Sequence, residues 1–136
     1  MANALFPLWK QELEKGTANT PLTGTVKATL LSGYTYNATH QFYSSVSAYA
    51  QGTPSPSGGM TTKTYVNGVF SADPVTFSAV SGTSVGAIVI YIDTGNPATS
   101  PLVAYLDTGI TGLPVTPNGG DIVVTWDTGA NKIFAL

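Results

Sequence analysis

The chain contains no cysteine, so neither disulfide bonds nor thiolate metal sites are available to it. Its 136 residues are the length of one domain. A chain of this size buries roughly two thirds of the surface that its unfolded form exposes, so it can hold a core without cross-links. The absence of cysteine also favours assembly inside a cell over secretion, because small secreted domains commonly depend on disulfides.

Charged residues are also scarce. They make up only 9% of the chain, against about 25% in an average soluble domain, and none of the five basic residues is arginine. Five scattered lysines and a net charge of −2 do not form the basic patch through which proteins bind nucleic acid. The 20 threonines and 11 serines instead predict a neutral surface rich in hydroxyl groups. Another protein can cover such a surface at a small desolvation cost.

Long hydrophobic runs are missing as well. The longest is AIVIYI, residues 87–92, which is far shorter than the roughly 20 residues of a membrane-spanning helix. The first residues, MANALFPLWK, lack the basic segment and the apolar core of a signal peptide. The sequence therefore predicts neither a membrane partner nor a signal sequence.

One helical pattern stands near the start of the chain. In FPLWKQELEKG, the residues Leu5, Trp9 and Leu13 recur at helical spacing, Pro7 suits a first turn, and Gly16 suits a C-terminal cap. A helix this short is not stable alone, so its apolar stripe must be buried. It is expected either to pack across a sheet of its own chain or to act as an arm that docks on a partner.

From residue 21 onward, short apolar runs alternate with turn-forming residues, which is typical of a β-sandwich or jelly roll. The predicted strands are 25–31, 45–50, 62–66, 68–72, 74–80, 86–93, 101–107, 113–116, 121–127 and 132–136, with a short helix within 39–46. Residues 51–60 are expected as an exposed loop, and PNGGD (117–121) as a hairpin turn. Because AIVIYI is apolar on both faces, cover by a second sheet is expected. The predicted fold is a mainly β, single-domain, jelly-roll-like sandwich (21–136) after a helix and linker (1–20).

The tripeptide Asp-Thr-Gly occurs three times, beginning at Asp93, Asp107 and Asp127. Aspartic proteases present their catalytic carboxylates in this motif, but they need two such carboxylates, from two lobes or two subunits, sharing a proton. Separations of 14 and 20 residues are too short for two lobes. Each copy instead follows an apolar strand, where Asp can accept backbone N–H bonds and Gly can take a positive φ. We therefore expect three strand-exit turns and no enzymatic activity.

Two other candidate sites depend on isolated side chains. His40 is the only histidine, and no metal-ligand or nucleophile spacing surrounds it, so a surface or half-buried position is expected. Asp93, Asp107, Asp121 and Asp127 would bind calcium if they met at one end of a sandwich, although no local calcium-loop spacing is present. No catalytic residue, metal site or cofactor is predicted.

Aromatic residues are the remaining candidates for function. Tyrosine supplies a large contact area with few torsions, so the tyrosine-rich segment 34–49 and the N-terminal aromatics suit contact with another protein. The alternative is that each of these side chains belongs to the core. The candidate contact residues, to a partner or to a second copy of the chain, are Phe6, Trp9, Tyr34, Tyr36, Phe42, Tyr43 and Tyr49.

Two stretches of the chain resemble a known family. They are FPLWKQELEKG leading into TVKATLL, and the C-terminal half from VIYIDTGNPATSP through LPVTPNGGDI to TWDTGANKIFAL. Together they resemble the capsid cementing (decoration) proteins of tailed bacteriophages, in particular those of short-tailed Bordetella-type phages. The resemblance implies a jelly-roll-like fold, homodimers at symmetry axes on the outside of an icosahedral shell, and no enzymatic role.

The resemblance also implies a location and a partner. Such a protein is made in the bacterial cytoplasm and resides on the capsid exterior, where it binds the major capsid protein. Its expected function is to cement neighbouring capsid proteins and so stabilise the shell against the pressure of the DNA inside. The alternative function is a glycan-binding jelly-roll module of a phage fibre or surface protein.

Overall fold

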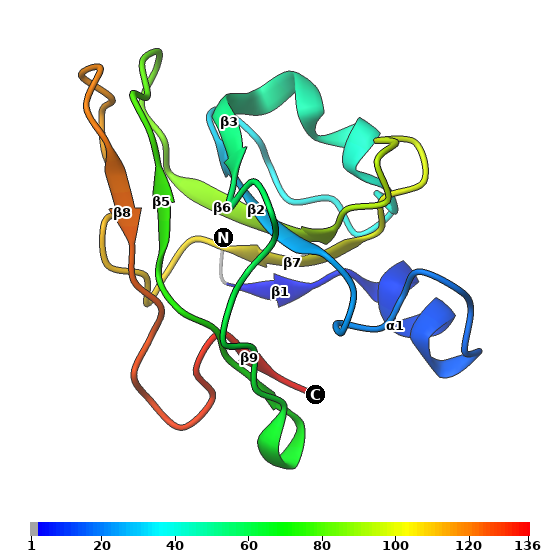
Figure 1. Ribbon diagram of the computed structural model, residues 1–136. Coiled ribbons are helices and arrows are strands. Elements are labelled where there is room, and N and C mark those ends of the chain that lie inside the picture. The colour runs from blue at the N-terminus through cyan, green and yellow to red at the C-terminus, as the bar shows by residue number, and fades with distance from the viewer. Residues whose placement is uncertain (1–2) are drawn as a thin grey trace.

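The computed structural model describes residues 3–136, which form a mainly β structure with one short α-helix (Figure 1). Its largest unit is an antiparallel sheet in the order β1-β7-β6-β2-β3. These strands are β1 (Ala4–Leu5), β2 (Val26–Leu31), β3 (Ala50–Ser55), β6 (Ala87–Ile92) and β7 (Leu102–Leu106). Two small antiparallel pairs complete the strands: β4 (Val69–Phe70) with β9 (Phe134–Ala135), and β5 (Val75–Phe77) with β8 (Ile122–Val124). The helices are α1 (Pro7–Glu14) and the 3-10 turns η1 (Tyr43–Ser45), η2 (Ser47–Tyr49) and η3 (Val66–Gly68).

Helix α1 forms where the sequence predicts it, and its apolar stripe packs against its own chain. Trp9 is 1% exposed, and its ring meets Phe134 of β9 edge-on, with ring centroids 6.0 Å apart. The Trp9 Nε1–H donates to the Thr20 carbonyl at 3.0 Å. Gly16 has φ +70°, as the predicted C-terminal cap requires. The first of the two alternatives for this helix is therefore confirmed: α1 packs against strands of its own chain.

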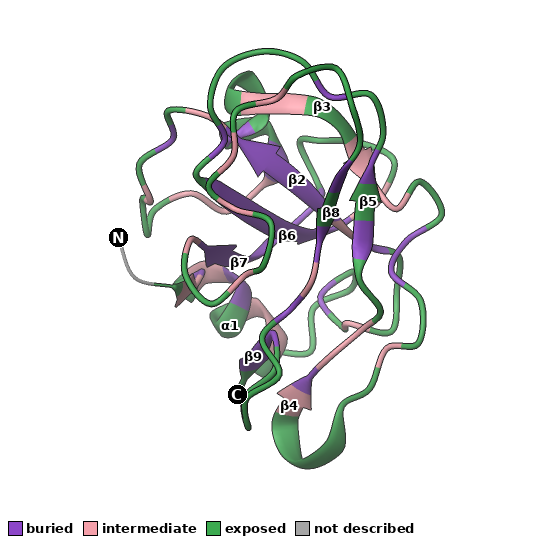
Figure 2. Ribbon diagram, turned by 90° about the vertical axis from the view of Figure 1, so that its left-hand side faces the viewer, coloured by how far each residue is buried: buried purple, intermediate pink, exposed green. Residues whose placement is uncertain are grey.

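Strand β6 is buried at every position, and both of its faces are covered (Figure 2). The face with Tyr91 is covered by the tyrosine-rich segment, since the Tyr43 ring stacks on Tyr91 with centroids 4.2 Å apart. The opposite face carries Ile88 and Ile90, which belong to the same hydrophobic cluster as the buried residues of β5 and β8. Helical turns therefore cover one face of the large sheet, and the small β5–β8 pair contributes buried residues to the same core, so the structure is consistent with the predicted sandwich.

Two predicted elements are wrong in the middle of the chain. Residues 45–50 are mostly 3-10 turns, and the strand begins only at Ala50. The first half of the expected loop 51–60 is strand β3, which pairs with β2 across a bulge. Gly52 and Pro54 predict a loop in the sequence, but an edge strand with a bulge tolerates both.

The pairing of the C-terminal strands also differs from the prediction. PNGGD does not join 113–116 to β8 as a hairpin, because Val115 pairs with Val85 while β8 pairs with β5. The predicted strand 62–66 is reduced to an isolated bridge from Thr64. These differences arise because partners distant in sequence, and not adjacent turns, determine the pairing.

Candidate interaction surfaces

The three Asp-Thr-Gly segments are turns at strand exits, and each is anchored in its own way. Asp93 and Asp127 each accept the N–H of the glycine two residues later, at 2.9 and 3.0 Å, as predicted. At the second copy, the side chain of Asn3 accepts the N–H groups of Asp107 and Thr108 at 2.7 and 3.0 Å. Asn3 also donates to the Thr108 carbonyl at 2.9 Å. No local sequence pattern indicates this role of Asn3, because it lies more than 100 residues from this turn.

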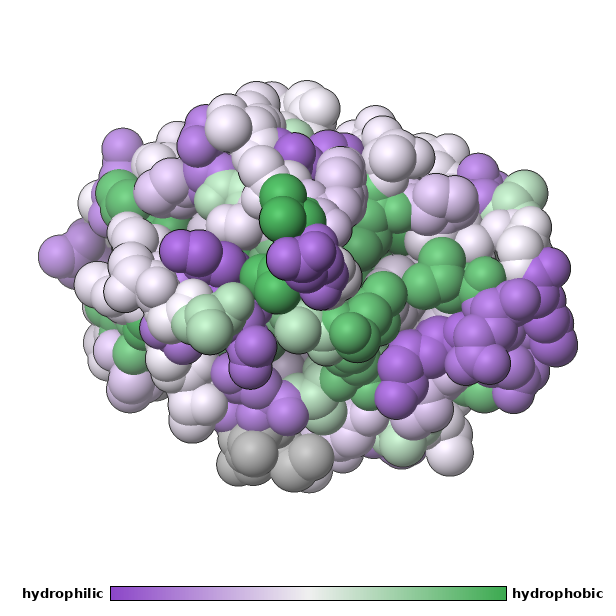
Figure 3. Space-filling model, turned by 90° about the horizontal axis from the view of Figure 1, so that it is seen from below, coloured by the Kyte–Doolittle hydropathy of each residue, from purple (hydrophilic) through white to green (hydrophobic). Residues whose placement is uncertain are grey.

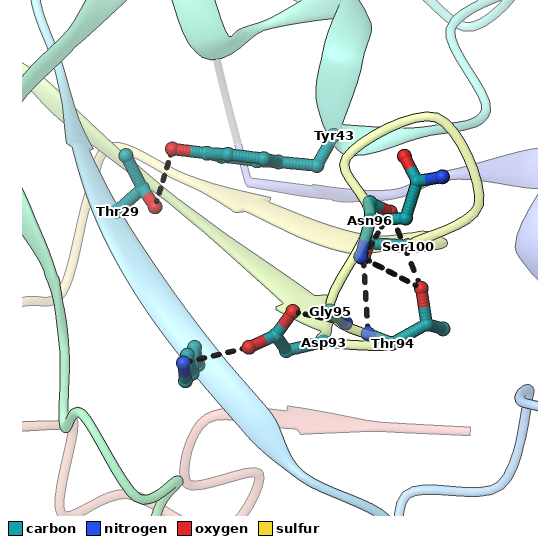
Figure 4. A network of polar contacts seen from close by, with 8 residues as sticks. Thr29, Tyr43, Asp93, Thr94, Gly95, Asn96 and Ser100 are labelled. Atoms are coloured by element: carbon teal, nitrogen blue, oxygen red, sulfur yellow. Dashed lines mark hydrogen bonds and ion pairs between the residues drawn. The ribbon is translucent and has the colours of Figure 1, made fainter.

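The first of these turns belongs to a polar network that orders the loop 93–100 (Figure 4). Lys27 of β2 reaches the Asp93 carboxylate at 2.6 Å, and both side chains are half-buried. This ammonium, followed by the Gly95 N–H, lowers the pKa of Asp93. Beyond the turn, the Thr94 N–H donates to the Ser100 hydroxyl at 3.1 Å, which donates to the Asn96 carbonyl at 2.9 Å. This network fixes the conformation of the loop, because its polar groups bond to one another.

The Lys27–Asp93 ion pair makes the stability of the folded protein depend on pH. Because the folded-state pKa of Asp93 lies below its ordinary value of 3.8, the pair stabilises the protein above that value, and the contribution is lost as pH falls through the lower folded pKa. We expect Asp93→Asn to lower the melting temperature at neutral pH, and this difference from the wild type to shrink in strong acid. Thermal melts across that range measure it. Lys27→Met should remove the same contribution, and a difference that does not change with pH would contradict the assignment.

Most of the aromatic candidates for contact lie inside the molecule. Phe6, Trp9, Tyr34 and Tyr43 are buried, Tyr36 and Phe42 are half-buried, and Tyr49 is 40% exposed. Burial raises the pKa of Tyr43 and of the Tyr91 on which it stacks, so both phenols stay neutral. Partner contact through these residues stays a prediction, and Tyr49 has the most accessible side chain of the seven.

His40 and the acidic residues also have local structural contacts. The Nδ1 atom of half-buried His40 lies 2.9 Å from the Tyr34 hydroxyl. Asp121 accepts the Ala79 N–H at 3.0 Å. Between residues 3 and 136, no three His, Asp or Glu side chains lie close enough to hold a metal ion. In the same part of the chain, no helix is long and apolar enough to cross a bilayer.

Hydrophobic side chains reach the surface together at one end of the molecule. We call this surface the apolar end, and it comprises Leu22, Tyr65, Val66, Val69 and Leu136. Val66 is 70% exposed, Leu136 62% and Tyr65 42%. Four of the five, all except Val66, surround a shallow hollow of about 70 Å³ that is also lined by the phenylalanines of β4 and β9. Val66 is the first residue of η3 and directly follows Tyr65. Figure 3 shows hydrophobic surface across this face, flanked by hydrophilic side chains.

Another depression, of about 430 Å³, lies between β3 and β5. Its lining is entirely proline and hydroxyl residues, namely Thr53, Pro54, Ser55, Pro56, Ser57, Thr76 and Ser78. It offers neither a charged group nor an aromatic ring. Such a lining gives a ligand little to stack on, so this depression is a weaker candidate for a binding site than the apolar end.

Comparison with protein-family models and with curated proteins identifies no relative of this chain. No protein-family model matches the chain, and no curated protein matches it significantly. The candidate function therefore depends on the surface, on the composition, and on the resemblance carried by the two stretches of sequence. In the structure these stretches lie together, because Trp9 of α1 packs on Phe134 of β9 and β2 pairs with β6.

Proposed function

We propose that this protein is a capsid-cementing protein, which binds the outer surface of an assembled phage shell and holds neighbouring major capsid proteins together. The observation that carries the proposal is the apolar end, a hydrophobic surface on a molecule whose remaining surface is rich in neutral hydroxyl groups. Hydrophobic patches of this kind mark contacts with other macromolecules. The choice of a phage shell as partner comes from the sequence resemblance. The proposal includes a jelly-roll-like arrangement of the strands and a homodimer.

The physical basis of cementing is linkage. A protein that binds the assembled shell but not its free subunits stabilises the shell. A typical interface buries about 1,600 Å² in total, and lost rigid-body freedom offsets much of the gain of roughly 25 cal/mol per Å². One copy then contributes little, but copies that bridge neighbouring subunits gain from effective concentration. A dimer on a two-fold axis would present the same patch to both sides.

Shells with and without the protein test the function directly. We expect the purified chain to run as a dimer and to sediment with assembled shells but not with free major capsid protein. Shells stripped of the protein should release their DNA at a lower temperature, and adding the protein back should restore the higher value. If stripped and restored shells burst at the same temperature, stabilisation is the wrong function.

A pair of valine variants tests the surface. Val66→Asp places a carboxylate in the apolar end, and burying that carboxylate without a partner should weaken shell binding by at least about 30-fold. Val123→Asp is the matched control, because Val123 is also exposed (52%) but lies in β8, outside the apolar end. Sedimentation at varied protein concentration gives the two affinities. Equal affinities for the two variants would exclude the apolar end as the binding surface.

A further inference from the structure

A cavity of about 310 Å³ lies between strands β1 and β9. Figure 1 shows these strands as neighbours, although they stand at opposite ends of the chain. Its wall includes Leu5 of β1, Ala135 of β9, and the charged Asp127 and Lys132. β1 is an edge of the five-stranded sheet, and β9 belongs to the separate pair with β4. The cavity therefore separates two sheets.

The backbone N–H and C=O of Leu5 point away from β7. Ala4 pairs with Tyr105, and the Phe6 N–H donates to the Val103 carbonyl at 3.0 Å. In an antiparallel ladder the residue between two hydrogen-bonded pairs turns its N–H and C=O outward, and here that residue is Leu5. The hydroxyl of Tyr36 donates to the Leu5 carbonyl at 3.2 Å, which agrees with this direction. A carbonyl has two lone pairs, so this oxygen can accept a second bond.

The backbone of Ala135 is open in the same way on β9. The Leu136 N–H donates to the Gly68 carbonyl at 2.9 Å, and Phe134 pairs with Phe70. Ala135, opposite Val69, therefore turns its N–H and C=O away from β4. Leu5 and Ala135, which lie on edges of two different sheets, both line this cavity.

The charges at the cavity add a second requirement on the occupant. Among the described residues, Asp127 uses one carboxylate oxygen for the Gly129 N–H, and the Lys132 ammonium touches only the Thr128 carbonyl, at 3.5 Å. Within residues 3–136 the ion pairs are Lys15–Glu12 and Lys27–Asp93, so neither Asp127 nor Lys132 takes part in one. One unpaired charge of each sign complements a ligand that carries one basic and one acidic group.

We propose that this cavity binds an extended peptide segment of another polypeptide by strand addition, with its backbone bonded to Leu5 and Ala135. A basic side chain of the segment faces Asp127 and an acidic one faces Lys132. Exposed edges recruit strands in this way because a peptide supplies donors and acceptors at the same spacing. A sugar could engage the charged side chains, but it does not match two strand edges. The inference goes beyond cementing and holds whether or not the segment comes from a capsid protein.

The test uses the full chain labelled with ¹⁵N and octapeptides selected from a random display library. Bound peptides should shift the amide resonances of Leu5 and Ala135 and slow their hydrogen exchange. The selected sequences should contain one acidic and one basic residue. Methylating alternate peptide nitrogens removes the donors that face one edge, and should weaken binding about tenfold while leaving the side chains intact.

Substitutions at two positions separate the backbone contact from the charge contact. Ala135→Pro removes the outward N–H without removing a bond to β4, and should weaken binding about tenfold, whereas Ala135→Val keeps the N–H and should bind normally. Lys132 has φ +48°, which asparagine tolerates, so Lys132→Asn should remove only the preference for an acidic residue. If Ala135→Pro does not fold, the methylated peptides still test whether binding requires hydrogen bonds between the peptide backbone and the strand edges.

Three results would overturn the proposal. The first is a library that yields no binder, and the second is selected peptides that leave the Leu5 and Ala135 amides unchanged. The third is that millimolar glucose, galactose or N-acetylglucosamine displaces the peptides and shifts Asp127 and Lys132, which would assign the cavity to a saccharide.

Discussion

Trp9→Ala is expected to lower the free energy of unfolding by about 3–5 kcal/mol, which is the usual cost of removing a large aromatic ring from a core. Trp9 is 1% exposed and connects α1 to β9 through Phe134. Its loss leaves a cavity and also leaves the Thr20 carbonyl without the indole N–H. The substitution therefore acts on packing and on a buried hydrogen bond together. Urea denaturation followed by circular dichroism measures the change.

Two further substitutions in the same helix separate these contributions. Trp9→Phe keeps most of the buried ring but loses the bond to the Thr20 carbonyl, so a cost of about 1–3 kcal/mol is expected. Lys10→Ala, at an exposed position of α1, should change stability by less than about 0.5 kcal/mol. If Trp9→Ala cost no more than Lys10→Ala, the helix would not be docked on β9 as described.

The sequence predicts elements whose signal is local. Helix α1 and strands β2, β6 and β7 appear where apolar spacing, β-branched residues and capping residues indicate them. Strand β3 escapes prediction because Gly52 and Pro54 favour a loop, and only the open edge of β2 makes a strand there favourable. The sequence also does not predict the aromatic side chains that cover the sheet, for a related reason. Nothing near Tyr43 in the sequence reveals that its ring stacks on Tyr91.

The candidate surfaces were harder to predict than the fold. The apolar end draws Leu22, the neighbouring Tyr65 and Val69, and Leu136 from three separate segments. Each residue alone is typical of an ordinary strand or turn. The edges facing the cavity between β1 and β9 are backbone groups, which no side-chain motif marks. Conversely, the N-terminal aromatics and the aromatic richness at 34–49 suggest a contact surface, while four of the seven aromatic candidates are buried. Exposure depends on packing between distant segments, and composition does not encode it.

Gly112→Ala is the second substitution with a large expected effect, and Gly95→Ala is its matched control. Both glycines have positive φ, +108° and +88°, so alanine is strained at each by roughly 1–3 kcal/mol. At Gly95 an added Cβ meets no atom within 4 Å, and lower entropy of the unfolded chain offsets part of the strain, by about 0.4–1 kcal/mol. We expect a net loss near 1 kcal/mol for Gly95→Ala.

At Gly112 the same Cβ would lie 2.5 Å from the Val123 carbonyl oxygen, a backbone atom that cannot rotate away. Either the 111–125 bridge opens, breaking its reciprocal bonds of 3.0 and 3.1 Å, or β8 moves away from β5. Both routes displace Trp126, whose indole N–H donates to the Asp73 carbonyl at 3.0 Å. Gly112→Ala should therefore cost at least about 3 kcal/mol, from strain and lost hydrogen bonds together. Urea denaturation of both variants separates the free-energy cost of the clash at Gly112 from the cost of placing alanine at a positive φ. Equal losses would mean that the close approach to Val123 does not exist in solution.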